Sequence, residues 1–120
     1  MKIAICAESN HEEAQASNRY ARSDYFAIYD TDRKTYDFFE NEAKRESSGA
    51  GNKATKILGD RGTRVLLAPK VGPQAFEMLD AFEIEVYQYD AAMTVNDALE
   101  AYFEGRLLKV TESSEEGHVA

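Results

Sequence analysis

Three short runs of β-branched and aromatic residues in the first third of the chain predict three strands. They span Ile3–Ala7, Tyr25–Tyr29 and Thr35–Glu40. The first run shows no strong alternation, as expected of a strand that is covered on both faces. The Asp-rich break Asp30–Lys34 between the second and third runs predicts a hairpin. We therefore expect these strands to form an antiparallel meander.

A long polar stretch, Ser9–Asp24, separates the first two predicted strands and has no sustained apolar period. Long ordered loops in small domains are often functional. This loop is therefore a candidate for functional residues.

After the third strand the apolar residues take up helical spacing, and helices then alternate with strands. The apolar positions of the first predicted helix are Ala50, Ala54, Ile57 and Leu58, and Gly62 is expected to stop it. A buried strand, Arg64–Ala68, follows it. Gly72–Pro73 opens a second helix, with Pro at the first-turn position that it favours. We expect this helix to turn Phe76 and Leu79 inward.

The last third predicts a fifth strand, Ile84–Tyr87, and a third helix that ends at Gly105. Thr94 and Asp97 have the spacing of a capping box at the start of this helix. Its apolar face is expected to consist of Val95, Ala98, Leu99, Tyr102 and Phe103. Residues 1–108 are expected to form a single domain and residues 109–120 a polar, flexible tail.

The resulting order of elements, βββ-α-β-α-β-α, limits how the sheet can be built. A strand–helix–strand crossover joins parallel neighbours, so the fourth strand is expected beside the first and the fifth beyond it. The predicted architecture is an α/β domain with three helices and a mixed five-stranded sheet of order 3-2-1-4-5. This is the layout of ribonuclease H-like folds, which have three layers.

Composition narrows the classes of function. The 120 residues carry a net charge of -8, which disfavours binding to a phosphate backbone, so no nucleic-acid partner is expected. No apolar stretch is long enough to span a membrane, and the charged start differs from a secretory signal, which favours a cytosolic protein. The single cysteine, Cys6, excludes an internal disulfide and a multi-cysteine zinc site.

Two glycine-marked helix starts are the first candidate binding elements. The residues concerned are Gly49, Ala50 and Gly51 at one start and Lys70, Gly72 and Pro73 at the other. Unpaired N–H groups in the first turn of a helix attract anions, and small residues let a ligand approach the backbone. The predicted sheet order places both starts near one edge, beside Lys70. The structural alternatives are an N-cap with closely packed glycines at Gly49–Gly51 and a bare turn before Pro73.

The other residues that could bind a metal or take part in catalysis favour structural interpretations. Cys6 lies in the predicted central strand, where a buried small hydrophobe is expected more often than a thiolate ligand. His11 and His118 have no partner at metal-ligand spacing. A nuclease of this fold would need a carboxylate near the middle of the first strand, and Ile3–Ala7 contains none. We therefore expect no catalytic residues and no metal-dependent cleavage.

Beyond these patterns, the chain resembles the dinitrogenase iron–molybdenum cofactor-binding family, the NifX/NafY-type domain that also ends NifB proteins. The segments that carry the resemblance are Met1–Ile5, Ser17–Asp30, Gly49–Gly51 with Ala54, and Val71–Phe76 with Leu79 followed by Ile84–Tyr87. The second is similar to a family pattern of a basic residue, Phe-Gly-Arg, two small residues and Tyr-Phe. The resemblance runs from about residue 1 to 108, nearly the whole chain.

The resemblance implies a ribonuclease H-like fold and a protein that binds or carries metal–sulfur clusters during cofactor assembly, such as the iron–molybdenum cofactor. Such clusters are anions, so Arg19, Arg22, Lys70 and the helix starts would form their cradle. Arg19 stands where many members have His, and Tyr20–Ala21 replaces Phe-Gly. This departure favours electrostatic capture of a preassembled anion over ligation of a metal by an imidazole.

The leading hypothesis is therefore a non-enzymatic carrier of an anionic metal–sulfur cluster, with cofactor-assembly proteins as further partners. A second hypothesis is a regulatory or interaction domain that binds a small organic anion or a partner protein.

Overall fold

A six-stranded mixed sheet forms the centre of the computed structural model, which describes residues 1–90 and 92–111. The strands are β1 (Lys2–Ala7), β2 (Tyr25–Asp30), β3 (Thr35–Glu40), β4 (Thr63–Ala68), β5 (Glu85–Gln88) and β6 (Leu108–Val110). The helices are the short 3-10 helix η1 (Glu42–Arg45), α1 (Ala50–Asp60), α2 (Pro73–Ala81) and α3 (Val95–Phe103). None of the helices in the described ranges is long and apolar enough to cross a membrane.

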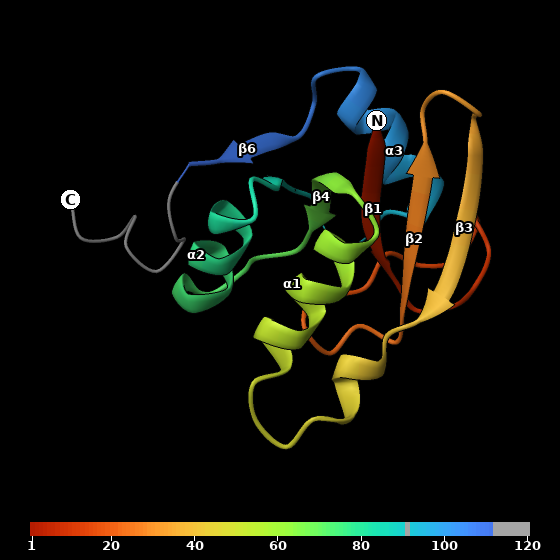
Figure 1. The fold of residues 1–120 in the computed structure, drawn as a ribbon. Coiled ribbons are helices and arrows are strands. Elements are labelled where there is room, and N and C mark those ends of the chain that lie inside the picture. The colour runs from red at the N-terminus through yellow and green to blue at the C-terminus, as the bar shows by residue number, and fades with distance from the viewer. Residues whose placement is uncertain (91, 112–120) are drawn as a thin grey trace.

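The sheet has the order β3-β2-β1-β4-β5-β6 (Figure 1). β1 pairs antiparallel with β2 and parallel with β4, and β4 pairs parallel with β5. The predicted order 3-2-1-4-5, the antiparallel meander and the three α-helices are therefore confirmed. The predicted count of five strands is wrong, because β6 adds an antiparallel edge strand beside β5, and the sheet thereby departs from the five-stranded ribonuclease H-like layout that was predicted.

No sequence pattern predicts β6, because the strand has only three residues and two of them are exposed. Lys109 and Val110, which the sequence assigned to a flexible tail, lie in this strand. Residues 112–120 of the predicted tail lie outside the described residues. The other unpredicted element is η1, where the side chain of Asn41 caps a single short turn.

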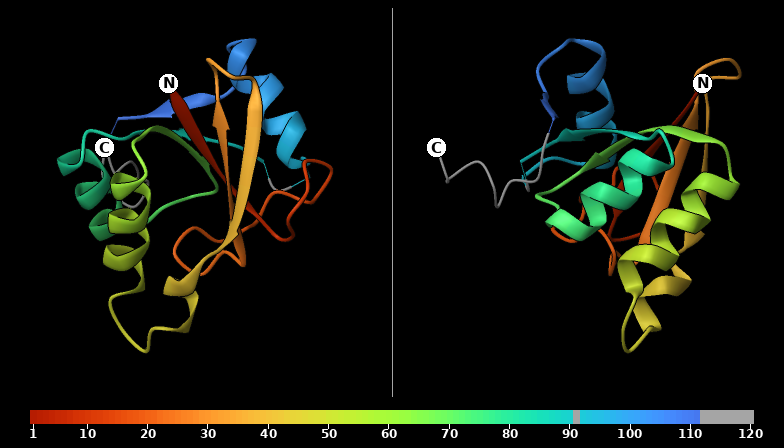
Figure 2. Two further views of the ribbon diagram at one scale, coloured as in Figure 1. Left: turned by 45° about the vertical axis from the view of Figure 1, so that its right-hand side comes forward. Right: turned by 60° about the vertical axis from the view of Figure 1, so that its left-hand side comes forward.

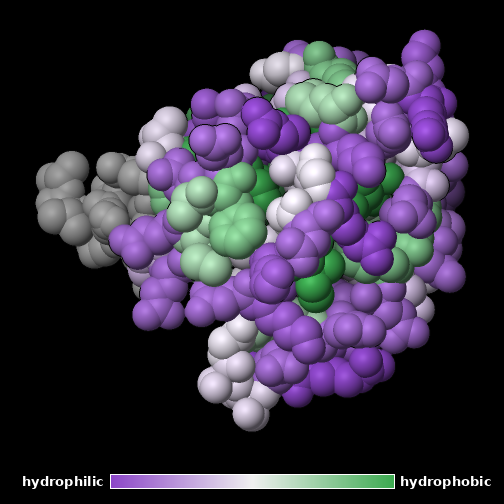
Figure 3. Space-filling model, in the orientation of Figure 1, coloured by the Kyte–Doolittle hydropathy of each residue, from purple (hydrophilic) through white to green (hydrophobic). Residues whose placement is uncertain are grey.

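Two helices cover one face of the sheet and α3 covers part of the other (Figure 2). The side of α1 and α2 buries a cluster that includes Cys6, Phe26, Leu58, Leu66 and Leu79. The side of α3 buries a second cluster that includes Ile3, Ile5, Val65, Leu67 and Leu99. β1 is buried from Ile3 to Ala7, as its uniformly apolar sequence predicts. Figure 3 shows that the outer face over α1 and α2 is mostly hydrophilic, with a hydrophobic patch over α2.

The ends of α3 follow the predicted signals with one exception. The Thr94 hydroxyl accepts a hydrogen bond from the Asp97 N–H, and the Asp97 carboxylate accepts one from the Thr94 N–H, which confirms the capping box. Gly105 follows the helix with a φ of 74°. Phe103 was expected on the buried face, but it is 55% exposed because the last turn of the helix lies beside Tyr29 at the margin of the core.

The side chain of Asn41 ties the long loop between β1 and β2 to the end of β3. Its amide donates to the carbonyl oxygens of Ala21 and Ser23, both at 2.9 Å, and its carbonyl oxygen accepts from the Ala43 N–H at 3.0 Å. Asn41 is fully buried. Buried polar groups are costly when they lose their partners, so this one side chain stabilises three backbone groups.

We predict that Asn41→Ala lowers the free energy of unfolding by about 3 kcal/mol, because it leaves two carbonyl groups and one N–H without their partner. Urea denaturation followed by circular dichroism measures the change. The control is Asn52→Ala on the exposed surface of α1, which should change the stability by less than about 0.5 kcal/mol. A loss of similar size in the two variants would contradict the role assigned to Asn41.

A second buried contact joins the loop to α1. The Tyr20 and Thr55 hydroxyl oxygens are 2.7 Å apart, and Thr55 Oγ1 also donates to the Gly51 carbonyl at 2.8 Å. A hydroxyl has one proton, so Tyr20 must be the donor to Thr55. Burial raises the pKa of Tyr20 well above its usual range, which keeps that proton in place.

This assignment predicts unequal effects of removing the two hydroxyls. Tyr20→Phe leaves Thr55 bonded to Gly51 and should lower the free energy of unfolding by about 1 kcal/mol. Thr55→Val leaves the buried Tyr20 hydroxyl without an acceptor and should lower it by about 2 kcal/mol. The double variant should lose less stability than the two single variants together, because it has no buried hydroxyl left without an acceptor. Urea denaturation of all three variants tests this order, and a larger loss in Tyr20→Phe than in Thr55→Val would reverse the assignment.

Candidate functional site

The carboxyl ends of β1 and β4 lie at one edge of the sheet, because the two strands are parallel neighbours. α1 precedes β4 and α2 follows it, so both helices begin at this edge (Figure 1). A Cβ atom placed on Gly51 of α1 would lie 3.9 Å from Cβ of Ala75 in α2. The first turns of the two helices are therefore adjacent, as the sequence predicted from topology.

Both helix starts lack a side-chain cap. Gly49 caps α1 with a φ of 74°, and apart from the glycine and its two chain neighbours no atom of the described residues lies within 4 Å of the position that its Cβ would take. Glycine is therefore required here by the left-handed backbone, and close packing is not the reason. Gly72 caps α2 from an extended conformation, and Pro73 follows at the first position without an N–H. No side chain bonds the free N–H groups of either first turn in the described structure, so they remain available to an anion.

The two predicted arginines line one hollow of about 260 Å³ at the end of β1. Its walls are Glu8, Ser17, Asn18, Arg19, Arg22 and Asp24. Glu8 and Asp24 were not predicted. The predicted pairing of β1 with β2 could have located them. Ala7 of β1 pairs with Tyr25 of β2, so Glu8, which follows β1, and Asp24, which precedes β2, reach the same edge of the sheet.

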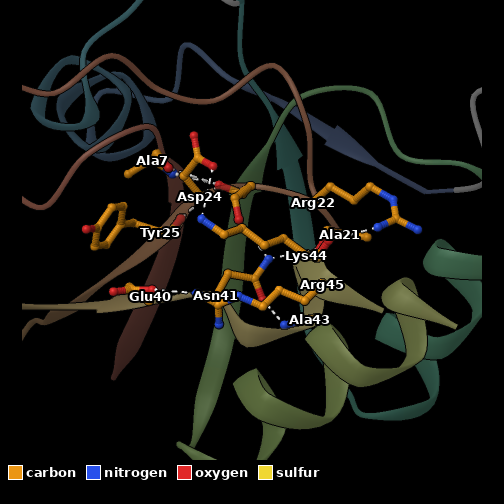
Figure 4. Close-up of polar contacts among 11 residues, drawn as sticks. Ala7, Ala21, Arg22, Asp24, Tyr25, Glu40, Asn41, Ala43, Lys44 and Arg45 are labelled. Carbon is orange, nitrogen blue, oxygen red and sulfur yellow. Dashed lines mark hydrogen bonds and ion pairs between the residues drawn. The ribbon is translucent and has the colours of Figure 1, made fainter. Parts of the chain in front are cut away.

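Arg19 and Arg22 have different surroundings in this hollow, and Figure 4 shows those of Arg22. The Arg22 guanidinium donates to the Lys44 carbonyl of η1 at 2.9 Å, and the Lys44 ammonium lies 3.3 Å from the Asp24 carboxylate. Within residues 1–90 and 92–111, the Arg19 guanidinium has no ion pair or hydrogen bond, and only its backbone N–H bonds, to Ser17 Oγ. Arg19 therefore offers its full set of donors to a ligand.

The positions of both arginines follow from the buried residues around them. Tyr20 lies between them in sequence and is buried against α1, where it bonds to Thr55. Asn41 and Ser23 fix the backbone on the other side of Arg22, and the Ser23 hydroxyl both donates to the Ala7 carbonyl and accepts from the Ala7 N–H at 3.1 Å. The loop therefore presents Arg19 and Arg22 to solvent from a fixed backbone.

The predicted site residues form two neighbouring groups. Arg19 and Arg22 share the hollow, whereas Gly49, Ala50, Gly51, Gly72 and Pro73 belong to the two helix starts. Lys70 is exposed in the turn after β4, and Ala50 is buried. Neither lines the hollow. The sheet edge is common to all of these residues, and their joint role in binding stays a prediction.

Side-chain ligands for a metal are scarce in the described part of the chain. It holds no group of three or more His, Cys, Asp or Glu residues arranged to bind a metal ion. Cys6 is fully buried, which confirms its interpretation as a small hydrophobe, and burial raises the pKa of its thiol. His11 is exposed in the loop, and His118 lies outside the described residues.

Comparisons with known proteins agree with this architecture. The apo form of the orange protein from Desulfovibrio gigas has a TM-score of 0.89 to this structure and 29% sequence identity, over 92% of this chain and 93% of its own. A candidate NifB protein from Thermotoga has a TM-score of 0.84 and 35% identity, over 97% and 98% of the two chains. An uncharacterized protein of Methanocaldococcus jannaschii is 23% identical over 112 residues, which is 91% of each chain.

The family resemblance noted in the sequence is confirmed by a direct match. A sequence profile described as dinitrogenase iron-molybdenum cofactor matches residues 1–105, which include β1 to β5, the three α-helices and both groups of predicted site residues. The chain therefore belongs to the dinitrogenase iron-molybdenum cofactor family.

Proposed function

We propose that this protein is a non-enzymatic carrier that binds an anionic metal–sulfur cluster, either iron–molybdenum cofactor-like or otherwise molybdenum-containing, during cofactor assembly. The observation that carries the proposal is the Arg19 guanidinium, which has no partner among the described residues, in a hollow at the sheet edge where two helices begin with glycine caps. Family membership supplies the class of ligand. Cofactor-assembly proteins would deliver and receive the cluster, and we place this action in the cytosol.

The physical basis is charge and hydrogen bonding. The sulfide surface of such a cluster is negative and accepts hydrogen bonds, and guanidinium groups supply several donors together with a positive charge. Arg19 would contact the cluster directly, and Arg22 would do so with the donors that it does not use on Lys44. The helix starts at Gly49–Gly51 and Gly72–Pro73 would add backbone N–H groups, and Lys70 would close the rim.

The carboxylates in the hollow set a limit on what can bind. Asp24 is balanced by Lys44, but Glu8 has no ion pair among the described residues and opposes a bound anion. The arginines must overcome this repulsion. Binding by charge and hydrogen bonds would be reversible, which suits a protein that passes its cargo on.

Anaerobic incubation with tetrathiomolybdate tests the proposal. We expect protein-bound thiomolybdate absorption after gel filtration, and Arg19→Ala should weaken binding about tenfold, equivalent to about 1.4 kcal/mol. Arg19→Lys should retain part of the affinity, since it keeps the charge but loses the planar fork of donors.

The matched control is Arg64→Ala, which removes one exposed arginine of β4 that lies outside the hollow and should leave affinity nearly unchanged. Absence of bound absorption in the wild-type protein, or an equal loss in the two alanine variants, would refute the site. The second hypothesis, a domain that binds a small organic anion, would gain support if metal-free carboxylates raised the thermal midpoint while thiomolybdate did not.

A further inference from the structure

Six aromatic side chains form a continuous row across the α3 side of the sheet, and we call this row the aromatic stripe. Its members, in order, are Phe38, Tyr36, Tyr29, Phe103, Tyr102 and Tyr87. Successive ring centroids are 5.4, 5.0, 6.2, 5.6 and 4.9 Å apart. These are the separations of interacting aromatic pairs, so the rings support one another in fixed positions.

The aromatic stripe extends beyond the part of the sheet that α3 covers. α3 packs mainly over β1 and β4, and it reaches the neighbouring strands at two points, where Phe103 lies against Tyr29 and the Tyr36 hydroxyl donates to Asn96 Oδ1 at 3.1 Å. Tyr29, Tyr36 and Phe38 themselves stand on β2 and β3. In the described ranges, no second helix lies on this side (Figure 2). The stripe residues are half-buried on β2, β3 and β5, and Phe103 is 55% exposed. Aromatic residues gathered on a surface in this way are typical of protein–protein interfaces.

Two carboxylates give the aromatic stripe a negative border. Glu12 and Glu100 lie close enough to act on Tyr36, whose pKa is raised first by burial and then by these carboxylates and Tyr29. Neither glutamate has an ion pair among the described residues, although Glu100 accepts a hydrogen bond from the Asn96 amide at 3.3 Å. At the other end, Glu85 and Glu104 are already paired with Lys109 and Arg106. Of these four glutamates, the two that have no ion pair among the described residues are therefore the ones that act on Tyr36.

The combination of aromatic rings and carboxylates favours a positively charged partner. The faces of aromatic rings are negative and attract guanidinium and ammonium groups, and the nearby carboxylates add to that attraction. A second copy of the chain, with net charge -8 and the same carboxylates, would be repelled. A nucleic acid would be repelled for the same reason.

We propose that the aromatic stripe is the docking surface for a partner protein that presents arginine and lysine side chains. Its cations would stack on Tyr29, Tyr36 and Phe103 and pair with Glu12 and Glu100. The stripe lies on the face of the sheet that α3 flanks, and the arginine hollow lies at the sheet edge. Docking at the stripe is thus separate from the anion site and does not depend on the proposed cargo.

The test is an NMR titration of the full-length, isotope-labelled protein with a synthetic peptide of alternating arginine and leucine. A peptide with glutamate in place of arginine is the reference. We expect the arginine peptide to shift ring resonances of Tyr29, Tyr36 and Phe103 first, and the glutamate peptide to shift none of them. Phe103→Ser, an exposed position that should leave the fold intact, is expected to weaken binding at least fivefold, as is the pair Glu12→Gln and Glu100→Gln.

The matched control is the pair Glu77→Gln and Asp80→Asn, which removes two exposed negative charges from α2 on the other side of the sheet. If this pair weakens binding as much as the stripe variants do, the peptide responds to overall charge and the proposal is overturned. Absence of binding at millimolar peptide overturns it as well. Sedimentation that shows a dimer abolished by Phe103→Ser would make a second copy the occupant, which also refutes a basic partner.

Discussion

The parallel pairing of β1 with β4 is the constraint on which the rest of the structure depends. The strands are joined through β2, β3 and α1, so their parallel contact sets the direction of each intervening element. Once the pairing forms, both strands end at the same edge. α1 must then begin there and α2 must leave from there, which brings two helix starts together without any contact specific to a ligand.

Three buried side chains convert this edge from a set of chain ends into a defined surface. Asn41, Ser23 and Tyr20 bond to backbone or to α1 at positions that flank the arginines. Their hydrogen bonds hold the loop backbone in one conformation, so the exposed side chains beside them project from a fixed backbone. The scaffold of the candidate site therefore consists of polar residues in the core, while the groups that would touch a ligand are on the surface.

Charge separates the two surfaces that this protein presents. The chain as a whole is acidic; the hollow brings two arginines together with Glu8 and Asp24, whereas the aromatic stripe gathers rings beside Glu12 and Glu100, which have no ion pair among the described residues. An anionic cargo at the edge and a basic partner on the α3 side would then occupy different places and would not compete. Such an arrangement is physically consistent with a protein that must hold a cargo and meet other proteins in turn.

By itself, the sequence determined most of the framework. Periodicity and turn residues located β1 to β5 and the three α-helices, and the crossover rule was sufficient to order the sheet. Residue patterns such as the Thr94–Asp97 capping box and the buried Cys6 were local enough to be predicted, because their physics depends on near neighbours in sequence. The arginines were found through the family resemblance, and the glycines through their link to helix starts.

Only the tertiary structure decided the rest. β6 is too short and too exposed to have a pattern of its own, and it exists because β5 offers an open edge. Glu8 and Asp24 enter the hollow because β1 and β2 are paired, and Phe103 is exposed because of where α3 ends relative to Tyr29. Most of the role of Asn41 could not be predicted, since two of the three partners of its side chain, Ser23 and Ala21, are 18 and 20 residues away. Long-range contacts of this kind form only when the sheet assembles, so they cannot be predicted from residues that are neighbours in the sequence.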